Sequence, residues 1–165
     1  MRSWSVKPTV KFSDVSPSVL HAASKQFLAV DAQGQLLSWP LNSADLNEAE
    51  AKHKFDKKLA AVVSAPSWPH AVVVSADGFV APMAGDGSAL LDAWQWPLVD
   101  VPKAQKVKLL AVDAASPDAM TLITSVQDQI ILTVLVWNET TLVPASSTDI
   151  LAILVNYFSS ICETS

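Results

Sequence analysis

The residues that could carry nucleophilic, acid–base or metal chemistry are few and scattered in this sequence. Ser64, His70 and Asp77 follow one another in a short stretch, but a catalytic triad is defined by its geometry and not by chain order. Cys162 has no neighbouring base that would activate its thiol. The Gly-Asp-Gly segment at 85–87 lacks the ending of a phosphate-binding loop and is interpreted as a plain turn. The histidines show no zinc-ligand spacing: His21, His53 and His70. We therefore predict a protein that is not an enzyme and uses neither a metal nor a cofactor.

Tryptophan is the unusual residue of this composition, with six copies. Trp39 and Trp137 stand at the ends of apolar runs, so we expect them to pack in the core as structural residues. Trp68 falls at a predicted turn, and Trp94 and Trp96 fall in a predicted outer strand. We expect these three indoles to be exposed in the free chain and to serve as anchors of a protein interface. Aromatic side chains that become buried in a complex contribute most of the binding free energy of such interfaces.

The elements that must position these residues are short strands joined by tight turns. Residues 107–137 contain three apolar runs, separated by a Ser-Pro turn and by a polar turn at 126–128. A similar pattern surrounds Gly34 and Gly78, each of which supplies the positive φ of a hairpin turn. The predicted strands are 4–7, 10–12, 27–30, 35–39, one near Phe55, 59–64, 71–75, 79–83, 89–99, 108–113, 120–125 and 130–137.

The repetition of this pattern decides the predicted fold. Gly34, Gly78 and Gln129 lie 44 and 51 residues apart, close to the period of a β-propeller blade. We predict an all-β chain that forms about three blades of an incomplete propeller; an antiparallel sandwich or barrel is the alternative. The predicted units are a blade remnant at 1–8, blades at about 9–57, 58–103 and 104–148, and the start of a further blade or a terminal cap at 149–165.

An incomplete propeller has a physical consequence for partners. Propellers close with about 4 to 8 blades, because each blade buries both faces against its neighbours. Three blades leave two apolar faces open, which favours a component of a larger assembly whose other subunits cover them.

The composition limits the other functions. Half of the 165 residues are apolar and 16% are charged, which excludes a disordered chain. The net charge is −5, and the lysines at 52–58 have acidic neighbours, so no nucleic-acid site is predicted. The N-terminus lacks the apolar core of a signal peptide, and no apolar run approaches the ~20 residues of a membrane span. We therefore expect an intracellular protein that does not enter a membrane.

Several of these motifs resemble divergent WD-repeat propellers. The shared features are the Ser-Pro turns, the Asp-Gly type turns, and Trp39 and Trp137 closing the third strand of a blade. The sequence departs from regular WD repeats, because no Gly-His pair precedes the first strand and no Asp follows either tryptophan. The side-chain network that usually links such blades is therefore in doubt here. More narrowly, residues 4–7, 36–39 and 54–57 look like the N-terminal propeller of the nucleolar protein eleven family, over roughly residues 3–85 with a weaker continuation to about 140.

The resemblance implies a non-enzymatic scaffold in the nucleolus. That family belongs to the early, rDNA-associated (UtpA/t-UTP) subcomplex of the small-subunit processome, which acts in rRNA processing and ribosome biogenesis. It implies other protein subunits as partners and transfers no catalytic residue to this chain. The alternative function is a small β-domain that binds a ligand in a pocket lined by Met83, Trp94 and Trp96.

Overall fold

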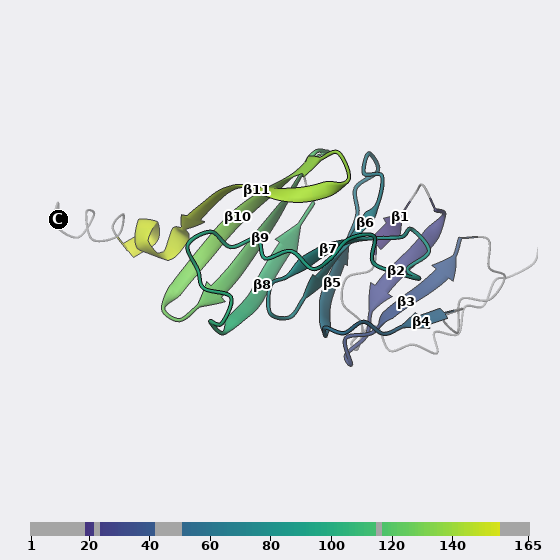
Figure 1. Cartoon of the computed structure of the whole chain (residues 1–165), viewed down its shortest axis with the longest axis horizontal. Coiled ribbons are helices and arrows are strands. Elements are labelled where there is room, and N and C mark those ends of the chain that lie inside the picture. The colour runs from purple at the N-terminus through teal and green to yellow at the C-terminus, as the bar shows by residue number, and fades with distance from the viewer. Residues whose placement is uncertain (1–18, 22–23, 42–50, 115–116, 156–165) are drawn as a thin grey trace, which may run out of the picture.

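The computed structural model describes residues 19–21, 24–41, 51–114 and 117–155, which form three antiparallel β-sheets and one short helix (Figure 1). The all-β fold class is thereby confirmed, and none of the described sheets closes into a barrel. The predictions made for 1–8, for the strand at 10–12 and for Cys162 lie outside the described residues.

The first sheet contains four strands in chain order. They are β1 (Val19–His21), β2 (Gln26–Val30), β3 (Leu36–Pro40) and β4 (Ala51–His53). The central hairpin turns at Gly34, which has the predicted positive φ of 79°. Asp31 fixes this turn, because its Oδ1 accepts hydrogen bonds of 2.9 Å from the backbone N–H groups of Gln33 and Gln35. Sequence analysis missed β1, and β4 lies just before the predicted strand near Phe55.

The second sheet contains three strands, all close to their predicted positions. They are β5 (Leu59–Val63), β6 (Ala71–Ser75) and β7 (Val80–Met83). The turn between β6 and β7 has Gly78 at a φ of 83°, again as predicted. The Ser75 hydroxyl accepts a 2.8 Å hydrogen bond from the Phe79 N–H and donates one of 2.5 Å to Asp77, so the turn is closed by side chains as well as by the backbone.

The prediction of an outer strand at 89–99 was wrong. Beside β7 the structure has only two isolated bridges, Met83 to Leu90 and Val80 to Gln95. The indoles that made this segment look like a strand have other partners. Trp94 donates its Nε1–H to Asp56 over 2.7 Å, and Trp96 donates to the carbonyl of Val101 over 3.0 Å. The chain therefore loops along the edge of β7 without forming a ladder.

The third sheet has the longest strands. They are β8 (Val107–Asp113), β9 (Ala119–Val126), β10 (Gln129–Asn138) and β11 (Thr141–Asp149). The first three confirm the predicted strands, whereas β11 was missed. A short helix at 150–155 follows β11, and Asp149 Oδ1 accepts hydrogen bonds from the N–H groups of Leu151 and Ala152 at 3.0 and 3.2 Å. Residues 150–155 are therefore not the first strand of a further unit.

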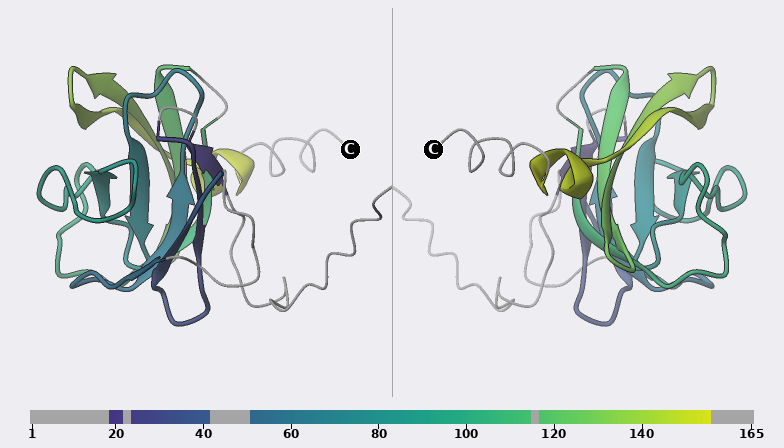
Figure 2. Two further views of the ribbon diagram at one scale, coloured as in Figure 1. Left: turned by 90° about the vertical axis from the view of Figure 1, so that its right-hand side faces the viewer. Right: turned by 90° about the vertical axis from the view of Figure 1, so that its left-hand side faces the viewer.

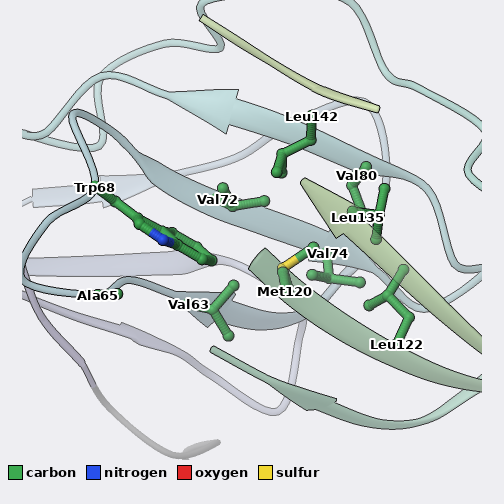
Figure 3. Packing of buried hydrophobic residues seen from close by; sticks show 10 residues of the cluster. All are labelled: Val63, Ala65, Trp68, Val72, Val74, Val80, Met120, Leu122, Leu135 and Leu142. Atoms are coloured by element: carbon green, nitrogen blue, oxygen red, sulfur yellow. The ribbon is translucent and has the colours of Figure 1, made fainter. Parts of the chain in front are cut away.

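The three sheets follow one another along the longest axis of the molecule, with the second sheet in the middle (Figure 1). Seen along that axis they overlap (Figure 2). Strand β6 is buried on both faces, because Val73 packs toward the first sheet while Val72 and Val74 pack toward the third. Figure 3 shows the cluster between the second and third sheets, in which Met120, Leu122 and Leu135 meet the valines of the second.

Candidate interaction surface

The residues that could carry catalysis are not brought together. Ser64 has a buried hydroxyl without a hydrogen-bond partner in the described part of the chain. The His70 ring lies edge-on to Trp137 at 6.4 Å, and Asp77 pairs with Lys57. Within the described ranges, no cluster of three His, Cys, Asp or Glu side chains forms a potential metal site.

One Ser–His contact was not foreseen from the sequence. The Ser38 Oγ lies 3.5 Å from His53 Nε2, across the β3–β4 pair. Ser38 is only 4% exposed, so its hydroxyl cannot meet a substrate carbonyl. The pair instead borders the turn at 85–87, where a Cβ on Gly87 would come within 2.7 Å of Leu36 and 3.3 Å of His53. This glycine allows the second sheet's loop to lie directly on the first sheet, which is a structural role.

Asp77 is the centre of a small polar cluster at the β6–β7 turn. Lys57 Nζ lies 2.8 Å from Asp77 Oδ2 and 3.8 Å from the centroid of the Phe79 ring. Partial burial raises the pKa of Asp77, but the hydrogen bonds from Lys57 and Ser75 and the charge of Lys57 outweigh it, so the pKa lies below its ordinary value of 3.8. The cluster thus ties the β6–β7 turn to Lys57, which lies 20 positions earlier in the chain.

The acid sensitivity of this cluster can be tested with Asp77→Asn. Because folding lowers the pKa of Asp77, the pair stabilises the fold above pH 3.8, and this contribution is lost as the pH falls through the lower folded-state pKa. We expect the variant to be less stable than the native chain by no more than about 1 kcal/mol at neutral pH, since the pair is solvent-exposed. The difference should vanish in strong acid.

Urea unfolding across the acid range measures this difference. Asp128→Asn is the matched control, because it lies in the corresponding turn of the third sheet and has no ion pair among the described side chains. A difference between Asp77→Asn and the native chain that stayed constant down to strong acid would contradict the assignment.

The expected exposure of Trp68 was wrong. The side chain is 2% exposed and lies in the cluster between the second and third sheets. Its ring meets that of Trp137 edge-on, with centroids 5.6 Å apart. The local turn that carries Trp68 directs the indole into the core, so this residue does not belong to a free surface. Trp39 and Trp137 pack in the core as predicted, at 7% exposure and partly buried.

Trp94 and Trp96 are partly buried and belong to different clusters. Trp94 packs against the core between the first and second sheets, whereas Trp96 packs against another cluster and meets the Phe79 ring at a tilt of 48°, with centroids 4.6 Å apart. Their role as interface anchors stays a prediction. Met83 is fully buried in the core, so its side chain is not accessible to a ligand in the pocket that we expected between Met83, Trp94 and Trp96.

The outer face of the third sheet is an apolar surface that is partly exposed. Along β9 and β10, buried and partly exposed residues alternate. The buried row, which includes Leu122 and Leu135, faces the second sheet. The opposite row forms the outer face, and its centre consists of Ile123, Leu132, Val134 and Val136. These four residues belong to none of the buried clusters of the described chain.

The outer face is uncharged at its centre and charged at one edge. In the register of β8 on β9, Lys108 pairs with Ser125 and Asp113 with Thr121, so both charged residues lie on this face and at opposite ends of β8. Leu110, on the same strand, is 47% exposed. The helix that follows β11 exposes three more aliphatic residues: Ile153, Leu154 and Val155. An apolar surface of this kind is typical of a protein interface.

No protein-family model matches this chain, and no curated protein matches it. Among the described residues, no helix has the length and hydropathy that are needed to cross a bilayer.

Proposed function

We propose that the chain is a non-enzymatic interaction module, an incomplete WD-repeat-like β-propeller of three blades that binds other protein subunits of a larger complex. One observation carries this proposal. Among the residues that the structure describes, the second sheet is covered on both faces, whereas the third sheet has one face covered and one face open. The open face is aliphatic and only partly buried by its own sheet. A partner that removes it from water lowers the free energy of the complex, and this favours binding.

The arrangement of the strands supports the propeller. Each described sheet is a meander in chain order, and successive sheets stack face to face, which is how propeller blades are built. On this interpretation β5 and β8 are the innermost strands of their blades. A groove of about 600 Å³ lies between them, lined by 60–64 and 109–114. In a propeller, the residues that line this groove would form part of the wall of the central channel.

The larger complex that we propose is one that processes rRNA for the small ribosomal subunit, in the nucleolus. This step rests on the resemblance of residues 4–7, 36–39 and 54–57 to the nucleolar protein eleven family. The buried Nε1 groups of Trp39 and Trp137 have no hydrogen-bond partner within the described chain, which agrees with a propeller that lacks the usual WD-repeat side-chain network.

The test is recovery of partners by the tagged full chain from cells that express it, with Leu132→Lys/Val134→Lys as the variant. Two lysines on the outer face would be desolvated by any partner that covers it. We expect recovery of the bound subunits to fall about tenfold or more, which corresponds to roughly 1.4 kcal/mol. Proteins of rRNA processing should be among those that are lost.

A matched control adds the same charge elsewhere on the same sheet. Glu139→Gln/Thr140→Lys changes the net charge by the same +2 in the exposed turn between β10 and β11 and should leave recovery unchanged. Equal recovery by the two double variants, with both chains folded, would contradict the proposal.

A further inference from the structure

The second and third sheets repeat one register, which a shared β-bulge fixes. In the second sheet the bulge on β5 lies between Leu59 and Ala61, opposite the end of β6. In the third sheet the bulge on β8 lies between Leu109 and Ala111, at the corresponding point opposite β9. Counting from the bulges, Val74 of β6 is equivalent to Ile123 of β9.

This register shows what the outer face of the third sheet corresponds to. Val74 pairs with Val80, and its equivalent Ile123 pairs with Leu132. Val74 and Val80 lie on the face of the second sheet that is covered by the third sheet. The outer face is therefore the same face, one unit further along, with larger aliphatic residues at the central pair.

We propose that the outer face docks a further antiparallel β-sheet, which a partner subunit presents face-on. The inference rests on the proposed function and names the chemistry of the partner. In the existing interface, the covering sheet presents a row of large aliphatic side chains: Met120, Leu122, Leu135 and Leu142. The partner sheet presents an equivalent row, because the surface that receives it has the same register and the same pleat.

One charge on the outer face adds specificity. Asp113 occupies the position of Val63 in the second sheet, which is buried. A partner that covers this position must place a basic side chain opposite Asp113, since an unpaired buried charge is costly. Lys108 corresponds to Lys58 of the second sheet, which is exposed, so it can stay in water when the face is covered.

A second copy of this chain is a poor occupant. Its own row of large aliphatic residues is already buried between its second and third sheets. On its first sheet, the face turned away from the second sheet has Ala29, Leu37 and Trp39, at 1%, 7% and 7% exposure. Self-association through sheet faces would thus bring two outer faces together, neither of which has the complementary row.

The experiment supplies the missing sheet in a defined form. The full chain is extended after residue 165 by a Gly/Ser linker and a second copy of residues 104–149, which offers the row of Met120, Leu122 and Leu135 to the outer face. We expect Tm to rise by roughly 5 °C or more while the protein stays monomeric. The control has Leu122→Asp and Leu135→Asp in the appended copy alone and should show no rise.

Two results would overturn the inference. One is a Tm that does not rise, or that rises equally in the control. The other is a dimer of the unextended chain, measured by sedimentation equilibrium, that Leu132→Lys/Val134→Lys dissociates, because the occupant would then be a second copy. Neither readout involves recovery of cellular partners, so failure of the docking geometry and failure of the proposed function can be told apart.

Discussion

Replacing Trp68 by alanine is expected to lower the free energy of unfolding by about 3–5 kcal/mol, the cost typical of a buried aromatic side chain. Trp68 closes one end of the cluster between the second and third sheets (Figure 3) and is 2% exposed. The substitution removes the indole from Trp137 and leaves a cavity that the surrounding strands cannot fill, because their ladders fix the backbone.

Chemical denaturation measures this loss, with two comparisons that isolate its cause. Trp68→Phe should be clearly milder than Trp68→Ala, since the Nε1–H of Trp68 has no acceptor in the described chain and no hydrogen bond is lost with it. Trp94→Ala should also cost less, because Trp94 is partly exposed. A loss below about 1 kcal/mol for Trp68→Ala would contradict the burial of this residue.

Single aspartate substitutions at neighbouring positions should distinguish the second sheet, which is covered on both faces, from the third sheet, which is covered on one face. In β6, Val73 and Val74 face opposite sides and both have 0% exposure. An unpaired carboxylate at either position is expected to cost more than about 4 kcal/mol, enough to unfold many domains. In β9, Leu122→Asp should have the same effect, whereas Ile123→Asp on the outer face should cost only about 1 kcal/mol.

The measurement is the fraction of soluble, cooperatively unfolding protein for the four variants, with their unfolding midpoints. The contrast between Leu122 and Ile123 is the informative one, since these neighbours differ only in the face that they occupy. If Ile123→Asp unfolded the chain as readily as Leu122→Asp, the outer face would have to be covered within the protein itself.

The hairpins could be predicted because their signals are local. Gly34 and Gly78 mark positions where the backbone must adopt a positive φ, and the apolar runs on either side give the strands. The hairpin that leads into β11 has no glycine. Glu139 adopts the positive φ of 57° there, and β11 itself contains Pro144 and two serines, so neither the turn nor the strand has the usual composition.

The candidate surface was predicted only in outline. The repeat indicated that apolar faces would stay open, but the residues on a face depend on strand register, which a bulge shifts by one position. Trp68 shows the same limit, because its burial results from packing on Trp137, 69 positions further along the chain. The segment at 89–99 shows the reverse error: its alternating indoles imitate a strand, while their hydrogen bonds to Asp56 and Val101 hold a loop.

The burial of β6 on both faces also has a consequence for how the molecule opens. Its amide groups are covered by β5 and β7 at the edges and by a sheet on each side, so their hydrogen exchange requires global unfolding. The third sheet is covered on one side only, so we expect its amide groups to exchange through local openings that leave the second sheet intact. Partner docking would then remove the route by which the chain first becomes accessible to proteases, and the subunit would be long-lived only after assembly.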